Sequence, residues 1–249
     1  MSFVFKITTT TSPQTFTIPC SPFGTFNATV DYGDGTGSQT VTAYNDSNLT
    51  HSFATAGQHT ITIDGTFPNI RFSNNATSAA LVDEVVDLGD VGWLMLYEAF
   101  LGCTNLTSFS TGTANTANNG FLQLTFKNCT SLTSVDLTNF DTSNATSFSN
   151  MFENCFSITT LDLSSFDTSS VTDMQLMFYR CLNLTTLDVS SFDTSSVTYM
   201  RLMFYRTNLT DLDIKHFDVS SVITASNFLL LSNNALTTAA YDELLEAWA

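Results

Sequence analysis

The sequence predicts an α/β repeat solenoid of parallel strands and short helices, preceded by a small all-β sandwich. The first observation is a 26-residue segment that recurs about five times between residues 100 and 217. Phenylalanine and cysteine keep this period, at Phe100, Phe126, Phe152, Phe178 and Phe204 and at Cys103, Cys129, Cys155 and Cys181. A fixed period of about 20–50 residues indicates stacked units that bury apolar side chains on their neighbours. The second observation is that residues 1–75 lack the repeat and alternate polar with apolar residues.

Each repeat is predicted to begin with a short strand. After the cysteine, apolar residues follow the spacing of leucine-rich repeats, in which alternate strand residues point inward. In one copy these residues are Ile158, Leu161, Leu163 and Phe166.

A short helix is predicted to follow each strand. An aspartate after the strand is expected to accept backbone N–H bonds as a helix cap, and it recurs as Asp141, Asp167, Asp193 and Asp218. The next apolar residues have helical spacing, as in Val171, Met174, Met177 and Phe178. We therefore expect a unit of strand, turn and helix, with the cysteine at the end of the helix.

Residues 1–75 are expected to form short antiparallel strands. Phe3, Phe5 and Ile7 alternate with polar neighbours, and further alternating segments are separated by Gly, Asn, Asp and Pro. Within residues 31–36, glycine is expected to supply positive φ and aspartate to bond the local backbone. Asp31 and Asp34 are candidates for Ca²⁺ binding, but the further acidic ligands of a dedicated loop are missing, which favours turn chemistry.

Two motifs of this region resemble the PKD-like immunoglobulin-like domain. They are Asp31-Tyr32-Gly33-Asp34-Gly35 and the later stretch from His51 to Ile63, with Phe53 and His59 in place of the usual aromatic residues. The resemblance covers about residues 25–65. It implies an immunoglobulin-like sandwich that serves as a spacer or binding module on an extracellular surface.

The chain is predicted to divide into three parts. Residues 1–75 form the sandwich, residues 76–235 the solenoid, and residues 236–249 a capping helix with Tyr241, Leu244, Leu245 and Trp248 on one face. At the start of the solenoid, Trp93 and Phe100 are expected to cover the open end of the first repeat, because a solenoid buries its end faces.

The repeats resemble those of the BspA-like surface proteins of bacteria and their phages. The pattern Met-Phe-x-x-Cys-x-x-Ile/Leu-Thr-x-Leu-Asp-Leu/Val-Ser-Ser-Phe-Asp-Thr-Ser-Ser-Val-Thr is nearly intact at 151–172 and 177–198. The resemblance covers about residues 80–249. It implies a cell-surface or particle-surface protein used in attachment, and it supplies no catalytic residues.

Composition disfavours several classes of partner. Only 7 Lys and Arg stand against 23 Asp and Glu, a formal charge of −16, which disfavours nucleic acid and anionic membranes. No apolar run is long enough to span a membrane. The first residues lack the pattern of a secretory leader, so we expect either that a leader is missing from this sequence or that the protein leaves its cell by another route, such as a virus particle.

The cysteines are expected to be free thiols. Four of the 5 cysteines share one repeat position, and stacked repeats would hold their Cβ vectors parallel, which is unsuitable for a disulfide. A straight row also cannot converge on zinc. Cys20 is out of phase and is expected to be unpaired.

No arrangement of residues predicts catalysis, so we expect a non-enzymatic protein without a cofactor or metal. The exposed strand side is the candidate binding face. Its residues are Thr160, Asp162, Ser164, Thr186, Asp188, Ser190, Asp136 and Asp213. This face is either simply solvated or a flat hydrogen-bonding surface for a glycan or protein. Regular Thr rows also suggest ice binding, which the interleaved Asp rows disfavour.

The leading hypothesis for function is a phage virion fibre or capsid decoration protein on the virion surface. Its partners would be other virion proteins or a protein or glycan on the host cell surface. The alternatives are a secreted bacterial adhesin at the cell surface, or a carbohydrate-binding module. The ligand and the oligomeric state are left open by the sequence.

Overall fold

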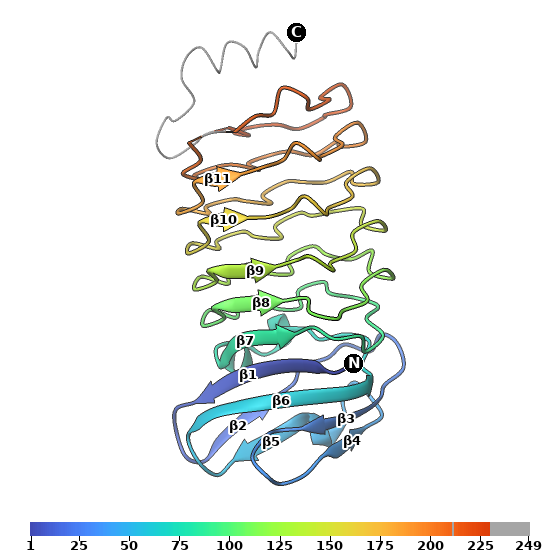
Figure 1. The fold of residues 1–249 in the computed structure, drawn as a ribbon, viewed down its shortest axis with the longest axis vertical. Coiled ribbons are helices and arrows are strands. Elements are labelled where there is room, and N and C mark those ends of the chain that lie inside the picture. Colours follow the sequence, from blue (N-terminus) through green and yellow to red (C-terminus); the bar gives the residue numbers. More distant parts are fainter. Residues whose placement is uncertain (211, 230–249) are drawn as a thin grey trace.

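The computed structural model describes residues 1–210 and 212–229. The chain forms an elongated stack (Figure 1), with the first strands at one end and successive coils of the repeat above them. The predicted capping helix at 236–249 and the last residues of the predicted solenoid lie outside the described residues. No helix within the described part of the chain has the length and apolar character needed to cross a membrane.

The N-terminal region contains six short strands. They are β1 (Phe3–Thr9), β2 (Gln14–Thr17), β3 (Asn27–Asp31), β4 (Gln39–Val41), β5 (Thr50–Phe53) and β6 (Gly57–Thr66), with a 3₁₀ turn, η1 (Ser47–Leu49), before β5. β1 pairs antiparallel with β6, and β2 pairs antiparallel with β5 in a sheet of their own. Every second residue of β1 is buried, beginning with Phe3 and Phe5. The alternation in the sequence therefore predicted these strands correctly.

The prediction of a separate sandwich followed by a solenoid is wrong. One seven-stranded mixed sheet runs from the N-terminal strands into the repeats, in the order β4-β3-β6-β1-β7-β8-β9. β7 (Val82–Asp87) pairs antiparallel with β1, and β8 (Ser108–Ser110) and β9 (Ser134–Asp136) follow in parallel. Without β7, β1 would present an unpaired edge. The coils add strands to this edge, so the alternating N-terminal segments and the repeats share one sheet.

The prediction of an α/β fold with a helix in each repeat is also wrong. Among the described residues the only α-helix is α1 (Ala76–Ala79), which follows the 3₁₀ turn η2 (Phe72–Asn74) and precedes the repeats. The later coils contain only the short strands β10 (Thr160–Leu161) and β11 (Thr186–Leu187), which pair in parallel. The segments expected to be helical are instead runs of turns.

Left-handed residues and bonds between coils explain why no helix forms. Asn150 and Asn154 have φ of 59° and 60°, which interrupts a right-handed helix. The N–H groups of Asn150 and Phe152 donate to carbonyl oxygens of the next coil, at 3.0 and 2.9 Å, rather than four residues back. The same conformation recurs at Leu124, Asn128, Leu176, Arg180, Leu202 and Arg206.

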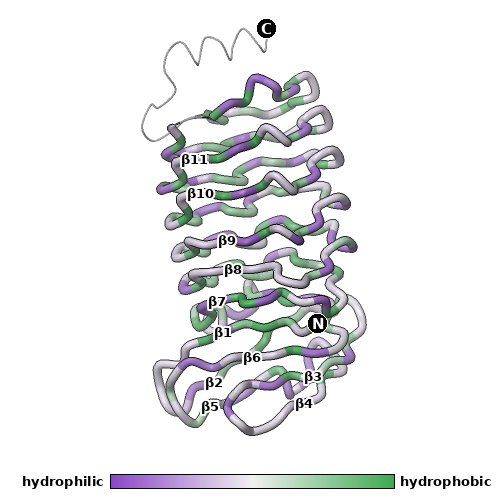
Figure 2. Tube along the Cα trace, in the orientation of Figure 1, coloured by the Kyte–Doolittle hydropathy of each residue, from purple (hydrophilic) through white to green (hydrophobic). Residues whose placement is uncertain are grey.

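A column of phenylalanine rings fills the centre of the stack. Rings 26 residues apart lie 5.4–6.0 Å apart between centroids and nearly parallel, from Phe100 through Phe126, Phe152 and Phe178 to Phe204. All five side chains are fully buried. Hydrophobic and hydrophilic stretches alternate along each coil (Figure 2). The in-phase stacking predicted from the period is therefore confirmed.

The cysteines form a second column and are free thiols, as predicted. The Sγ–H groups of Cys129, Cys155 and Cys181 each donate to the carbonyl oxygen of a phenylalanine in the preceding coil, at 3.1 Å. Burial raises the pKa of the Cys155 thiol well above its usual range. These cysteines therefore act as buried hydrogen-bond donors.

Threonines tie the coils together in a column that the sequence did not reveal. The Thr168 hydroxyl donates to the Asp193 carbonyl oxygen at 2.8 Å and accepts the Asp193 N–H at 2.7 Å. Thr142 bonds in the same way to Asp167 in the next coil. Both hydroxyl groups belong to nearly inaccessible residues, so each satisfies buried backbone groups of its neighbour.

The junction between the N-terminal strands and the coils is aromatic. Trp93 is fully buried, and its ring lies 5.2 Å from that of Phe3 on β1. Its indole N–H donates to the carbonyl oxygens of Leu88 and Gly89. Trp93, which was expected together with Phe100 to cover the open end of the first repeat, therefore packs against the N-terminal strands.

Candidate functional site

Seven of the residues predicted to form a binding face lie on β9, β10, β11 and the turns that follow them, Asp213 lies in the next coil, and all eight are exposed. Thr160 and Thr186 are direct partners in the parallel pairing of β10 with β11. Asp136, Asp162, Asp188 and Asp213 occupy the equivalent position in successive coils. Seven of the eight residues line one of two shallow hollows.

The first hollow has a volume of about 310 Å³ and spans the coils of β9 and β10. It is lined by Val135, Asp136, Leu137, Thr138, Asp162, Ser164 and Ser165. The second hollow, of about 280 Å³, is lined by Thr186, Leu187, Asp188, Val189, Ser190, Asp213 and His216. Thr160 lines neither hollow. Each hollow therefore combines two carboxylates from adjacent coils with serine and threonine hydroxyl groups.

The first hollow coincides with a break in the sheet. The seven-stranded sheet ends at β9, and β10 pairs only with β11. The strand backbones on the two sides of this hollow are therefore not joined by a ladder of hydrogen bonds. The equal repeat length in the sequence gave no sign of this interruption.

The carboxylates of the face are bonded within their own turns. Asp162 Oδ1 accepts the N–H and the hydroxyl of Ser164, at 3.0 and 2.6 Å. These two bonds lower the pKa of Asp162, against smaller opposing effects of desolvation and of the Asp188 charge. Bonds from Ser190 lower the pKa of Asp188 in the same way. Both aspartates therefore remain charged at mildly acidic pH. They fix the conformation of their turns and also present negative charge on the face.

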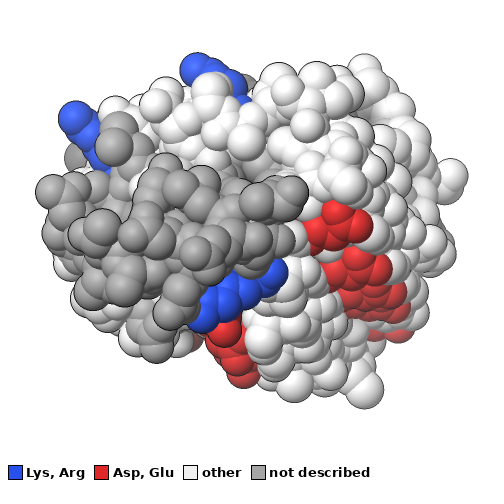
Figure 3. Space-filling model, turned by 90° about the horizontal axis from the view of Figure 1, so that it is seen from above, with Lys and Arg blue, Asp and Glu red and all other residues white. Residues whose placement is uncertain are grey.

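The aspartates expected to cap helices lie in a second set of turns. Asp141, Asp167 and Asp193 accept the N–H and hydroxyl groups of the serines two residues later. They accept backbone N–H bonds, as predicted, but no helix begins there. Seen down the stack, acidic side chains form a column along one side of the molecule (Figure 3).

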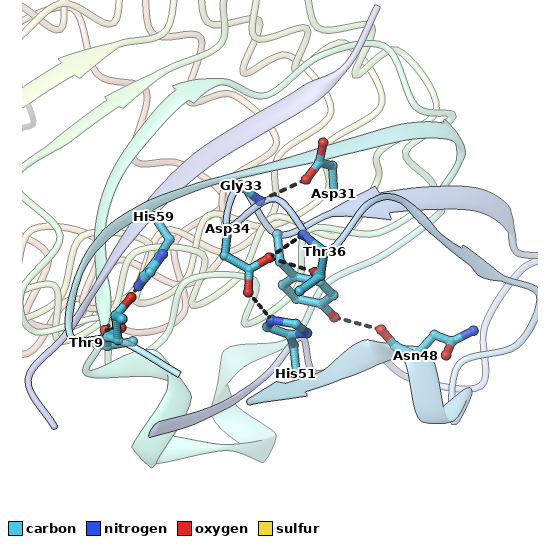
Figure 4. Close-up of polar contacts among 10 residues, drawn as sticks. Thr9, Asp31, Gly33, Asp34, Thr36, Asn48, His51 and His59 are labelled. Atoms are coloured by element: carbon cyan, nitrogen blue, oxygen red, sulfur yellow. Dashed lines mark hydrogen bonds and ion pairs between the residues drawn. The ribbon is translucent and has the colours of Figure 1, made fainter. Parts of the chain in front are cut away.

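Neither aspartate of the N-terminal turn is free (Figure 4). Asp31 accepts the Gly33 N–H at 2.8 Å, and Asp34 accepts the N–H and hydroxyl of Thr36 and contacts His51 Nε2 at 2.7 Å. Gly33 has φ of 71°, and a Cβ there would lie 2.3 Å from the Thr60 carbonyl oxygen, so this turn requires glycine.

Local hydrogen bonds also set the charge of Asp34. Desolvation raises its pKa, but the Thr36 and His51 contacts outweigh this effect and lower the pKa to about 2. His51 in turn stacks on the Tyr32 ring at 4.3 Å. The other histidine of this region, His59, stacks on Phe53 at 4.0 Å. Each of these groups thus has a local structural contact.

No cluster of three or more potential metal ligands exists among residues 1–210 and 212–229. The aspartates of the repeats are spaced one coil apart and bonded to their own Ser or Thr, rather than directed at a common point.

Comparison with known proteins gives one match. A family model described as "Mycoplasma protein of unknown function, DUF285" matches residues 120–240, a little under half of the chain. The matched stretch begins before β9 and includes every candidate residue of the binding face. No curated protein and no solved structure matches the chain.

Proposed function

We propose that this protein is a non-enzymatic surface attachment protein whose strand face binds a glycan through the two hollows. The observation that carries the proposal is that seven of the eight residues singled out by sequence line these hollows. Serine and threonine hydroxyl groups and paired carboxylates suit the hydroxyl groups of a sugar. In the first hollow, the partly exposed side chain of Val135 suits the apolar side of its ring.

The sheet break adds a reason to place the ligand at the first hollow. No strand pairing joins β9 to β10, and we expect the backbone groups between them to hydrogen-bond a polar ligand or water. The surface of a fully paired sheet offers a ligand only side chains, because its backbone groups already bond to neighbouring strands.

The proposed location is the surface of a bacterial cell. The resemblance of the repeats to BspA-like surface proteins supports it, and so does the family match, whose description names Mycoplasma. The alternative of a virion fibre or decoration protein shares the same attachment face. It would be favoured by finding the protein in purified phage particles by mass spectrometry.

A glycan array with the purified full chain tests the proposal. The variant Asp162→Ala/Asp188→Ala removes one carboxylate from each hollow and should abolish binding of the neutral glycans that the wild-type chain retains. The matched control is Asp167→Ala/Asp193→Ala, because these residues form the same turn with the same serine bonds but line neither hollow. Equal loss in both variants, or no wild-type binding to any glycan, would refute the proposal.

A further inference from the structure

Three arginines of the last coils form no ion pair with an acidic residue of the described part of the chain, although the chain holds 23 Asp and Glu. Lys6, Arg71 and Lys127 each form an ion pair with a glutamate, at N–O distances of 2.6–2.9 Å. No described carboxylate pairs with Arg180, Arg201 or Arg206. In an acidic chain, uncompensated guanidinium groups in adjacent coils are unexpected.

Two of these arginines, Arg180 and Arg206, directly follow stacked tyrosines in the chain. The rings of Tyr179 and Tyr205 are 5.3 Å apart and nearly parallel, and the Arg180 N–H donates to the Tyr205 carbonyl oxygen at 2.8 Å. Arg180 and Arg206 share a left-handed backbone with φ of 57°, so the same geometry is repeated one coil apart. We call Tyr179, Arg180, Tyr205 and Arg206 the arginine–tyrosine face.

Arg180 is partly withdrawn from water without compensation by a charge. Its Nε is buried and has no hydrogen-bond partner, and its guanidinium carbon lies 5.5 Å from the centre of the Phe156 ring. Arg206 lies 5.6 Å from the Tyr205 ring. Aromatic rings hold a guanidinium in place while leaving its edge N–H groups available to an acceptor. Arg201 and Arg206 are exposed.

We propose that the arginine–tyrosine face binds an acidic polysaccharide through its carboxylate or sulfate groups. Guanidinium groups form paired, charge-assisted hydrogen bonds with such groups. The tyrosine hydroxyl groups are suited to the sugar hydroxyl groups beside them. This site is separate from the hollows of the strand face and does not depend on the function proposed for them.

The spacing favours a polysaccharide over an acidic peptide. The face repeats at the coil spacing, given by the 5.3 Å between the tyrosine rings. An extended peptide presents side chains on one side only about every 6.6 Å, since successive residues about 3.3 Å apart alternate sides. In a chain of sugar rings with one anionic group per ring, the anionic groups on one side are not restricted to every second unit.

The negative charge of the chain does not prevent this binding. In about 0.15 M salt the Debye length is about 8 Å, so acidic groups farther than this from the arginines repel an anion only weakly. In the view down the stack, some basic side chains lie on the side opposite the acidic column, and others lie next to acidic side chains (Figure 3).

Calorimetric titration of the purified full chain with a polyuronate and with heparin, in about 0.15 M salt, tests the proposal. We expect Arg180→Gln and Arg206→Gln each to weaken binding by about tenfold, the loss expected for one charge-assisted hydrogen bond. Lys215→Gln changes the net charge equally but lies on the strand side, and it should change the affinity by less than about twofold.

Other outcomes would overturn the assignment. They are no binding of either polymer by the wild-type chain, equal weakening by Lys215→Gln, or tighter binding of polyglutamate than of both polysaccharides. Neutral dextran serves as the polymer control, and binding to dextran as tight as to heparin would also contradict a role for charge. Thermal melts of each variant establish that the fold is intact.

Discussion

Replacing Phe152 by alanine should be among the most destabilising single changes in the coils. The ring is fully buried between Phe126 and Phe178, with centroids 5.4 and 6.0 Å away. A buried Phe→Ala change costs about 3–5 kcal/mol, because transfer energy is lost and a cavity remains. For a chain of this size, each kcal/mol lowers the melting temperature by about 2–4 °C, so we expect a fall of about 10 °C.

Urea unfolding followed by circular dichroism measures this loss directly. Phe121→Ala is the control, because Phe121 is 51% exposed and should lose less than about 1 kcal/mol. A double-mutant cycle with Phe126→Ala should give a coupling of about 0.5–1.5 kcal/mol between the stacked rings. A loss at Phe152 no larger than at Phe121, or additive effects at Phe126 and Phe152, would show that the column does not carry the stability of the stack.

Two further predictions concern polar contacts. Thr168→Val keeps the shape of a buried side chain but removes the hydroxyl that serves the Asp193 N–H and carbonyl groups. The free energy of unfolding in urea should fall by about 2–4 kcal/mol, whereas the same change at exposed Thr160 should lower it by less than about 1 kcal/mol. Equal losses would show that the buried threonine hydroxyl groups do not stabilise the contacts between coils. For Asp34, whose folded pKa of about 2 lies below the unfolded value of about 3.9, the stabilisation is complete above pH 4 and is lost as pH falls through 2. Unfolding midpoints of the wild type and Asp34→Asn should therefore differ at pH 6 and converge near pH 2; a difference that persists at pH 2 would refute this account.

The sequence was sufficient for features that depend on the period alone. In-phase phenylalanines predicted the ring column, and the shared cysteine position predicted free thiols. The choice of candidate binding residues also followed from phase, and seven of the eight line surface hollows, although their role in binding is a prediction. None of these inferences required knowing the backbone path within a coil.

The predicted helices failed because hydrophobic spacing does not determine where an N–H donates. Val171, Met174, Met177 and Phe178 are buried, as the helical pattern required. However, a chain of turns buries the same positions while its alternate N–H groups reach the next coil. Asn150 and Asn154 were the available signal, since asparagine tolerates left-handed φ. Leucine and arginine hold the same conformation two coils later, so local preference alone would not have identified it.

The bonding pattern that replaced the helices also explains how the coils depend on one another. A helix satisfies its N–H groups internally, so a helical repeat can form its hydrogen bonds before its neighbours are in place. Here Phe126, Phe152 and Phe178 each donate an N–H to the coil that follows, and the buried threonines and cysteines also bond to adjacent coils. A single coil would leave these buried groups unsatisfied, at a cost of about 1–3 kcal/mol each. The N-terminal strands are therefore the natural place for the stack to begin, because β1 supplies the first paired edge on which β7 and the following coils can form.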